Sequence, residues 1–494
     1  MNENPRLYEI NTLEWLGELS RSYGKSIKLG DVPSEQWARL KRLGFDYVWL
    51  MGVWKRSREG VKLFKESPEW PRLRTHLDSI LPGWTDEDVT GSPYSIASYT
   101  PEPRIGTWSD IDNTREELRR RGMKLILDFV PNHTAPDHPW VIEHADYYIQ
   151  GSQLDYQQNP DAFFPVRKGK RIRYIARGKD PYFPPWPDTA QLNYFNPAMR
   201  TALIGELGTI AEHCDGVRCD MAMLLLDDIF TGTWGWTRKE SEKGPLEFWE
   251  DARKALPDFL LIAEAYWDTE WRLQQLGFDY VYDKRLYDRL RSSSAHDVSL
   301  HLTADLSYQK KLVRFIESHD EPRSAGVFDK NKLRAVIVLY STLPGMKLYH
   351  HGQLEGRKIH LPMLLSRTRE EQPDEEVKAF YEKVLSITRS DVFRNGEWGL
   401  QEVRSADGDS FTNLVAYRWK WNGKLKLVVV NLGSGYSQGM IPLEKELTND
   451  IDYLLIDELN GPQYVRSGRD MVDPGLHVVL EGYHSHMFDV KPAE

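Results

Sequence analysis

The sequence predicts an α/β protein with a (β/α)8 TIM barrel, a small domain inserted after the third strand, and a C-terminal antiparallel β-sandwich. Two observations predict the barrel: eight short apolar segments recur along residues 8–349, and helical segments separate most of them. A third predicts the sandwich, because the spacing of apolar residues changes to a period of two after about residue 395. At 494 residues, the chain is too long for a single hydrophobic core.

The first part of the barrel combines three predicted strands with two predicted helices. Residues 33–44 show helical spacing of apolar side chains and end at a glycine. The next helix is predicted to begin at a Ser109 cap followed by an acid three residues later, and to end at residues 121–122. The third strand is apolar almost throughout, which is typical of a parallel strand buried on both faces. The three strands are predicted at residues 8–13, 47–51 and 124–130.

A stretch rich in Pro, Tyr and basic residues interrupts the alternation after the third strand, and it is predicted to form the inserted domain. Its basic run at residues 167–173 is interpreted as a solvated hairpin that turns at Gly169, rather than as a phosphate site, because the whole chain is acidic. The predicted units are residues 1–132 and 196–394 for the barrel, 133–195 for the inserted domain, and 395–494 for the sandwich.

The second part of the barrel begins at Asn196 and Pro197, which supply a helix cap and a first-turn proline. Five strands follow, with helices predicted at residues 246–255 and 330–341; the strands are at residues 216–219, 260–264, 279–282, 312–316 and 346–349. A last helix is predicted at residues 374–388. The sandwich strands are predicted at residues 414–419, 425–431, 453–456 and 477–480.

Composition and charge restrict the classes of partner. The net charge of −10 argues against nucleic acid as the main partner. Cys214 and Cys219 have a spacing that fits no metal or disulfide framework, so both are expected to be buried thiols of a reducing compartment. The start of the chain lacks a basic and apolar leader, and no apolar run approaches the length of a membrane span. A soluble cytoplasmic protein is therefore expected, with no membrane partner and with an oligomeric state that the sequence does not indicate.

An arginine and an acid end the predicted strand at residues 216–219. Side chains alternate along a strand, so Arg218 and Asp220 are expected on the same face. Arg218 is then expected to lower the pKa of Asp220 and hold it ionised, as a nucleophilic carboxylate requires. Glu264 follows an apolar strand end, which is expected to raise its pKa and leave it with a proton to donate.

Polar groups also end other predicted strands, and active sites of such barrels lie at the carboxyl ends of the strands. Three acids and two histidines are therefore expected to converge on one mouth of the barrel. The segments that carry them are residues 128–133, 218–220, 263–265 and 317–320.

These segments resemble the four ordered sequence regions of the alpha-amylase family, a large family of retaining glycoside hydrolases and transglycosylases with a barrel, an inserted small domain and a C-terminal β-sandwich. The match covers nearly the whole chain, because Tyr94 before Gly106 and the run at residues 191–197 also correspond. The four regions are represented by residues 128–133, residues 216–220, Glu264, and the pair His319 and Asp320.

The resemblance implies that Asp220 is the nucleophile, Glu264 the general acid/base and Asp320 the acid that stabilises the transition state. It also implies that the pocket for the cleaved sugar is shaped by Arg218, His133, His319 and Tyr94. The chemistry of the residues gives the same first two roles, because cleavage with retention needs a nucleophilic carboxylate and a protonated one about 5 Å apart. Tyr94 is expected to stack on the sugar, and Asp128 is interpreted as structural.

The sequence also departs from the family pattern. Residues 221–224 read Met-Ala-Met-Leu where starch-acting members often carry Lys and His, which puts long-chain starch recognition in doubt. Ser318 stands where Asn is usual, and Arg323 follows. No cofactor is expected: Asn132 is a candidate calcium ligand, but the chain lacks an Asp-x-Asp-x-Asp-Gly loop, so calcium is not supported.

The sequence favours a retaining hydrolase of α-glucosidic bonds, acting on short α-glucosides or maltooligosaccharides through a covalent glycosyl-aspartate. A transglycosylase or a sugar phosphorylase would use the same intermediate with a sugar or phosphate as acceptor. The third hypothesis is a catalytically inactive carbohydrate-binding member of the family, and the presence of all three acids disfavours it.

Overall fold

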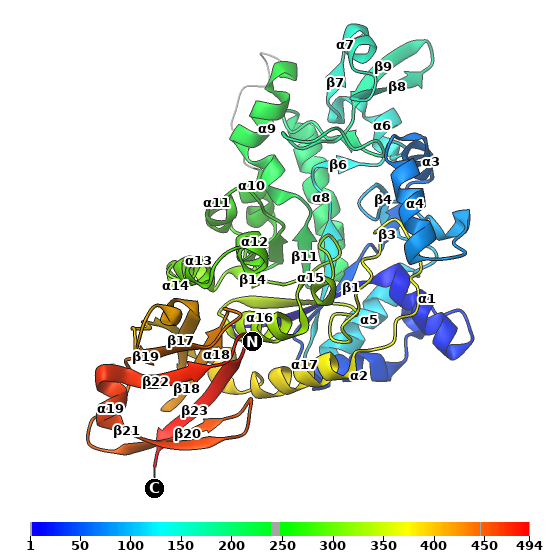
Figure 1. Cartoon of the computed structure of the whole chain (residues 1–494). Helices are drawn as coiled ribbons and strands as arrows, with labels where there is room; N and C mark the ends of the chain where they lie inside the picture. Colours follow the sequence, from blue (N-terminus) through cyan, green and yellow to red (C-terminus); the bar gives the residue numbers. More distant parts are fainter. Residues whose placement is uncertain (1, 239–247, 445, 494) are drawn as a thin grey trace.

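The computed structural model describes residues 2–238, 248–444 and 446–493. Within these ranges, eight parallel strands close into a barrel in the order β1-β15-β14-β13-β12-β11-β5-β2, as the sequence predicts (Figure 1). The barrel strands are β1 (Arg6–Asn11), β2 (Tyr47–Met51), β5 (Lys124–Phe129), β11 (Gly216–Cys219), β12 (Leu260–Ala263), β13 (Tyr280–Tyr282), β14 (Leu312–Arg314) and β15 (Met346–His350).

The barrel strands are short and almost completely buried. All residues of β1, β2, β11 and β15 are buried, which explains why the sequence shows apolar runs in place of alternation. The predicted positions agree closely with the observed strands, and β2 agrees at both ends. The exceptions to the apolar pattern are charged side chains inside the barrel, and Arg218 of β11 is one of them.

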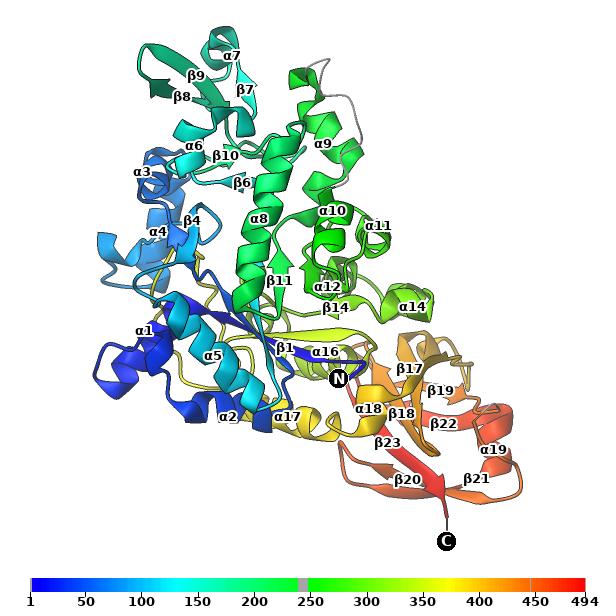
Figure 2. The same ribbon diagram turned by 180° about the vertical axis from the view of Figure 1, so that it is seen from behind.

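Helices follow the strands and form the outer ring; α8 lies alongside β11 between α5 and α10 (Figure 2). The main ones are α1 (Thr12–Tyr23), α2 (Ser34–Arg42), α5 (Trp108–Arg120), α8 (Pro197–His213), α10 (Phe248–Ala255), α11 (Glu270–Gln275), α12 (Lys284–Ser292), α16 (Lys330–Thr342) and α17 (Glu375–Ile387). The first two residues of the helix predicted at 246–255 lie outside the described residues.

The ends of α5 and α8 test the predicted caps. Asn196 caps α8, and its side chain accepts a hydrogen bond from the amide of Ala198, as predicted. The prediction that Ser109 caps α5 is wrong. Thr107 is the N-cap and forms a reciprocal capping box with Asp110, because the chain becomes helical two residues earlier than predicted.

Two segments outside the predicted barrel strands and helices contain secondary structure. Residues 52–103 form β3 (Trp54–Arg56), α3 (Arg58–Glu66), α4 (Trp70–Ile80) and β4 (Ile96–Pro101). After β5, the strands are β6 (His133–Thr134), β7 (Gln150–Gly151), β8 (Phe163–Lys168), β9 (Arg171–Ala176) and β10 (Ala190–Gln191). β8 and β9 pair as the predicted hairpin, and Gly169 takes the positive φ of 62° that its turn requires. The domain boundaries themselves stay a prediction.

The C-terminal region is antiparallel. Its six-stranded sheet has the order β16-β17-β18-β23-β20-β21, and β19 pairs with β22 in the described part of the chain. The strands are β16 (Glu397–Gln401), β17 (Leu414–Trp421), β18 (Lys424–Asn431), β19 (Ser437–Ile441), β20 (Asp452–Asp457), β21 (Gln463–Ser467), β22 (Leu476–Leu480) and β23 (Ser485–Pro492). This region lies at the opposite end of the molecule from the β7-β9-β8 sheet (Figures 1 and 2).

Strand β18 explains how this region joins the barrel. Leu427 and Val429 face a local core between the two sheets, whereas Val428 and Val430 belong to the main core that includes the barrel. Both faces of β18 are buried, which explains why its sequence contains a continuous apolar run. On β17, Trp419 also donates its indole N–H to the carbonyl oxygen of Thr342 at the end of α16, at 2.8 Å.

Both cysteines are free and buried, as expected. Burial raises the pKa of the Cys214 thiol to about 12 and also raises that of Cys219, so neither is a reactive thiolate at neutral pH. In the described residues, no helix combines the length and apolar character that a bilayer-crossing segment needs.

The α5 cap gives the first test. Thr107→Ala removes the acceptor for the Asp110 amide and is expected to lower the free energy of unfolding by about 1 kcal/mol. Ser109→Ala is the matched control, because Ser109 is exposed and lies within the helix. Urea unfolding followed by circular dichroism measures both. Equal effects of the two substitutions would contradict the assigned cap.

Candidate active site

The centre of the site is the buried guanidinium group of Arg218 on β11. Its Nη1 lies 2.7 Å from Oδ1 of Asp220, and its Nη2 lies 2.8 Å from Oε2 of Glu264 and 3.7 Å from Oδ2 of Asp320. The three predicted acids are therefore gathered around one cation at the carboxyl ends of the strands. Arg218 and Asp220 share a strand face, as predicted from alternation.

Aromatic rings enclose the same cation. The guanidinium carbon lies 5.2 Å from the ring centroid of Tyr94, 5.3 Å from that of Trp49 and 5.8 Å from that of Tyr282. Cation–π attraction of this kind favours the charged arginine, and the rings keep water away from it. The fork of Arg218 is consequently fixed in one orientation toward the acids.

Glu264 has the environment expected of a proton donor. Burial raises its pKa to about 7; Arg218 opposes this shift, and the negative charges of Asp220 and Asp320 add to it. The amide of Met221 donates to Oε2 at 2.7 Å, and the Tyr266 hydroxyl donates to Oε1 at 2.7 Å. The predicted rise in the pKa of Glu264 is confirmed.

The pKa of Asp220 differs from the expectation. Burial raises it above the ordinary aspartate value, and the attraction of Arg218 opposes the shift without reversing it. Arg218 lowers this pKa, as predicted, but the expectation that the pKa of Asp220 lies below its ordinary value is wrong. The physical reason is that the sequence does not show how completely the site is desolvated, nor that the same arginine is shared with other carboxylates.

Asp320 is the acid whose charge is most strongly held. Burial acts to raise the pKa of Asp320, but the positive charge of His319 lowers it to about 2, and Arg218 contributes to the lowering. His319 Nε2 lies 3.0 Å from Oδ2 of Asp320, and its Nδ1 contacts Oε1 of Glu9 on β1. The two acids raise the pKa of His319 well above its ordinary value, against the effect of burial.

Tyr94 lies at the edge of this network. Its hydroxyl oxygen is 2.7 Å from His319 Nε2, and the two rings are tilted by 31° with centroids 5.4 Å apart. His133 lies farther out, on β6, with its ring 5.2 Å from that of Trp186. Burial lowers the pKa of His133 to about 4, so it is neutral at pH 7, and the backbone of Tyr94 partly offsets this shift.

Asp128 has a structural environment, as predicted. Its carboxylate accepts hydrogen bonds from the Trp49 indole at 3.0 Å and from the amide of Gly52 at 2.6 Å. These bonds fix the end of β2 beside β5. Burial raises the pKa of Asp128 to about 6, with Arg218 and these donors opposing the shift.

The positions that depart from the family pattern have structural contacts. Met221 has a left-handed backbone with φ of 44°, and this places its amide on Glu264. Arg323 is buried and donates to Oε1 of Glu317 at 2.9 Å and to the carbonyl oxygen of His351 at 2.6 Å. Arg323 thus anchors the segment after β14.

The residues around Asn132 do not fit a calcium site. The side-chain oxygen of Asn132 accepts a hydrogen bond from Gln191 Nε2 at 3.1 Å. Within the described ranges, no cluster of three or more His, Cys, Asp or Glu side chains has metal-binding geometry. Calcium prefers six to eight oxygen ligands, including carboxylates, so no step is assigned to a metal.

Sequence reasoning missed Glu9, Tyr266 and a pair of exposed aromatic residues beside the acids. Glu9 was detectable as an acid within an apolar strand. Tyr182 and Trp267 lie with ring centroids 4.9 Å apart, and they line a cavity of about 550 Å³; Trp267 directly follows Tyr266 in the chain. Trp267 and Asp268 have φ values of 60° and 63°, which no sequence signal indicated.

A closed eight-stranded barrel with carboxylates at the carboxyl ends of its strands has the layout of the TIM-barrel class, with the acids where that fold places active sites. The family described as "Alpha amylase, catalytic domain" matches residues 33–405. The chain belongs to the alpha-amylase family.

Two relatives by sequence and one solved structure have the word amylase in their names. It is 26% identical over 333 residues to "Alpha-amylase 3" of Dictyoglomus thermophilum, a match covering 61% of each protein. It is 26% identical over 358 residues to "Trehalose synthase/amylase TreS" of Mycolicibacterium smegmatis, covering 64% of this chain and 56% of that protein. Both matches span less than two thirds of the relative. The solved structure of the maltogenic alpha-amylase AmyB from Thermotoga neapolitana shares the fold, with a TM-score of 0.70 at 21% identity over 99% of both chains.

Proposed function

We propose that the protein is a retaining glycoside hydrolase that cleaves α-glucosidic bonds in short α-glucosides or maltooligosaccharides. The observation that carries the proposal is the shared arginine. Arg218 contacts Asp220 and Glu264 with the two ends of one guanidinium group, and Asp320 completes the set. A nucleophile and an acid on either side of one sugar carbon are what cleavage with retention requires.

In the first step, Glu264 protonates the glycosidic oxygen while an oxygen of Asp220 attacks the anomeric carbon. The leaving alcohol takes the proton, and a covalent glycosyl-aspartate forms. In the second step, ionised Glu264 accepts a proton from water, and the resulting hydroxide displaces Asp220 from the sugar. The different environments of Glu264 and Asp220 support this division of roles, because Glu264 has a pKa near neutrality.

Asp320 and His319 bind the sugar hydroxyl groups in this proposal. The charge of Asp320 is held by His319, so its oxygens remain acceptors throughout the working pH range. Hydrogen bonds of this kind strengthen as the sugar ring flattens toward the oxocarbenium-like transition state. The ring of Tyr94 provides a stacking face, and His133 lines the outer wall near it.

The leaving-group side supports a short substrate. Residues 222–225 beside Glu264 are apolar and buried, and Met221 is partly exposed, so this side has few polar contacts where Lys and His would bind further sugars. Beyond them, the exposed rings of Tyr182 and Trp267 provide a stacking surface for one or two sugar units.

The same intermediate supports transfer to a sugar or to phosphate, and the exposed rings of Tyr182 and Trp267 are equally suited to hold an acceptor sugar. This is the second candidate function. An inactive carbohydrate-binding role is disfavoured by the ordered set of acids around Arg218.

Variants at the two carboxylates test the roles separately. Asp220→Asn is expected to lower turnover of both maltose and a nitrophenyl α-glucoside by about 1,000-fold or more, because it removes the nucleophile. Glu264→Gln is expected to lower turnover of maltose similarly, yet to change kcat/KM for the nitrophenyl substrate much less, because kcat/KM reports the first step and this leaving group needs little protonation.

The matched control for this experiment is Asp407→Asn, which removes an exposed carboxylate in the C-terminal region and is expected to leave turnover unchanged. Thermal unfolding verifies that each variant is folded. NMR of the first product gives the anomer. Full activity of either active-site variant, or a product of inverted configuration, would refute the mechanism.

The pH profile follows from the pKa of Glu264. This acid must be protonated before the first step, so kcat/KM is expected to fall as the pH rises through about 7. The acid limb is expected above the ordinary aspartate pKa, because burial raises that of Asp220. With the nitrophenyl substrate, Glu264→Gln should lose the alkaline limb. An alkaline limb that is unchanged in this variant would assign it to another group.

The acceptor is tested by product analysis. Incubation with maltose, isomaltose, sucrose, trehalose and maltooligosaccharides, with and without phosphate, is expected to yield free glucose as the main product. Chromatography and NMR follow the products. New disaccharides would indicate a transglycosylase, and a phosphate-dependent glucose 1-phosphate product would indicate a phosphorylase. Turnover of any of these substrates excludes an inactive carbohydrate-binding role.

A further inference from the structure

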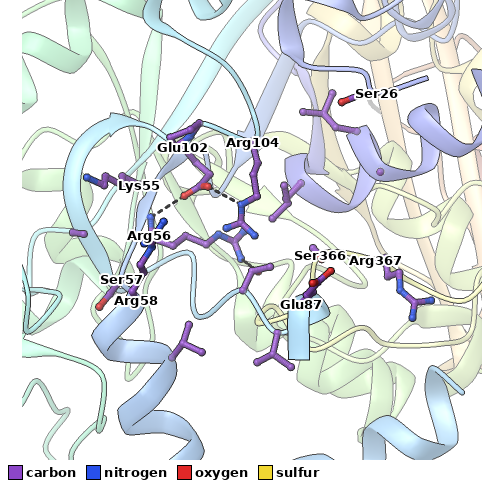
Figure 3. Close-up of a pocket in the computed structure, with 18 of the residues that line it drawn as sticks. Ser26, Lys55, Arg56, Ser57, Arg58, Glu87, Glu102, Arg104, Ser366 and Arg367 are labelled. Atoms are coloured by element: carbon purple, nitrogen blue, oxygen red, sulfur yellow. Dashed lines mark hydrogen bonds and ion pairs between the residues drawn. The ribbon is translucent and has the colours of Figure 1, made fainter. Parts of the chain in front are cut away.

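A second cavity, of about 1390 Å³, lies away from the three acids, between α1, the β3–α3 segment and the segment before α5 (Figure 3). None of its lining residues belongs to the set around Arg218. Of the described residues that line it, three are acidic and six are basic, although the protein as a whole is acidic. The basic ones are Arg21, Lys55, Arg56, Arg58, Arg104 and Arg367.

Arg56, at the end of β3, is the buried member of this group, with 5% of its surface exposed. Its Nη1 donates to Oγ1 of Thr90 and to the carbonyl oxygen of Gly91, both at 2.8 Å. Its Nε and Nη2 are buried and have no hydrogen-bond partner among the described residues. Arg56 therefore adds a positive charge to this wall of the cavity without a carboxylate bound to its guanidinium group.

A second arginine converges on Arg56. Figure 3 shows the side chains of Arg56 and Arg104 approaching one another beside Glu102. Glu102 accepts from Nε of Arg104 at 2.7 Å and from the backbone amide of Arg56 at 3.3 Å, and not from the guanidinium group of Arg56. Burial and the like charge of Arg104 lower the pKa of Arg56 to about 10. An anion between the two arginines would relieve this repulsion.

The remaining charged groups leave the cavity positive. Asp137 accepts a hydrogen bond from the Ser57 hydroxyl at 2.7 Å. Arg367 is paired with Asp88 at 2.6 Å. Lys55 and Arg58 are exposed on either side of Arg56 along the chain. Two of the three lining acids, Glu102 and Asp137, are thus engaged, and the third, Glu87, is exposed. The guanidinium group of Arg56 donates to a hydroxyl and a carbonyl oxygen and not to a carboxylate.

The size and walls of the cavity favour a ligand larger than a free ion. Its volume exceeds the range of about 300–1,000 Å³ typical of small-molecule sites. Apolar side chains from α1, α3, β4 and two connecting segments complete the lining: Leu13, Leu16, Ile27, Val61, Val89 and Ala97.

We infer that this cavity is a binding site for a phosphorylated small molecule, whose phosphate group is held by Arg104 and Arg58 beside the buried charge of Arg56. A phosphate monoester carries close to two negative charges at pH 7 and presents three acceptor oxygens, which matches two or three guanidinium groups. The site is separate from the sugar chemistry and does not depend on the proposed function.

Binding to the full chain is measured by isothermal titration calorimetry with glucose 6-phosphate, inorganic phosphate and glucose. Glucose 6-phosphate is expected to bind, inorganic phosphate to compete with it, and glucose to leave its binding at this site unaffected. Arg104→Gln and Arg58→Gln are each expected to weaken binding about tenfold, the effect of one lost charge-assisted hydrogen bond. Both side chains are exposed, so the variants should fold, whereas substitution of Arg56 would disturb Thr90 and Gly91.

Arg171→Gln is the matched control, because Arg171 is an exposed arginine of the β8–β9 hairpin outside the cavity. It is expected to bind glucose 6-phosphate like the unaltered protein. Glu264→Gln is expected to do the same, which separates this site from binding at the acids. Unchanged affinity in both cavity variants, equal affinity for glucose, or no binding of either phosphate probe at about 10 mM would overturn the inference.

Discussion

The structure depends on one buried cation that three carboxylates share. Arg218 lies inside the barrel, and removing its charge from water costs free energy that the carboxylates and the surrounding rings must offset. An arginine suits this position because it does not lose its proton at any physiological pH, and because its planar fork has separate ends for Asp220 and Glu264. A lysine would provide one point charge and no fixed orientation. Asp220 and Glu264 can therefore be buried side by side, with Asp320 at the exposed rim, without mutual repulsion dispersing them.

The register of the parallel barrel strands brings the acids within reach of Arg218. On β11 and β12, Cys219 pairs in register with Ala263, so the next residues, Asp220 and Glu264, leave adjacent strands at the same level. The amide of Glu264 donates to the carbonyl oxygen of Cys219 at 3.1 Å, which continues the ladder up to the site. A shift of register by one residue would turn one of the carboxyl groups away from Arg218. The closeness of the two acids is therefore a property of backbone pairing.

Much of this arrangement could be predicted from the sequence, because its signals are local. The eight apolar segments, the alternation that puts Arg218 and Asp220 on one face, and the apolar approach to Glu264 are each visible in a few consecutive residues. Other features are not local. The contact of His319 with Glu9 joins residues 310 positions apart, and the rise in the pKa of Asp220 depends on complete burial in a site built by several strands. The Thr107 cap was missed because Thr107 and Ser109, two polar residues separated by Trp108, could each begin α5, and only the backbone distinguishes them.

The segment at residues 90–94 connects the two cavities. At one end, Thr90 and Gly91 accept hydrogen bonds from Arg56; at the other, Tyr94 contacts His319. Pro93 packs so closely on Gly52 that a Cβ atom there would lie 2.8 Å from the proline ring, and Gly52 also has a φ of 76°. The amide of Gly52 is in turn fixed by Asp128. The position of the Tyr94 ring thus follows from a buried arginine on one side and a glycine on the other. A ligand that stabilises Arg56 would stabilise the same segment without touching the acids.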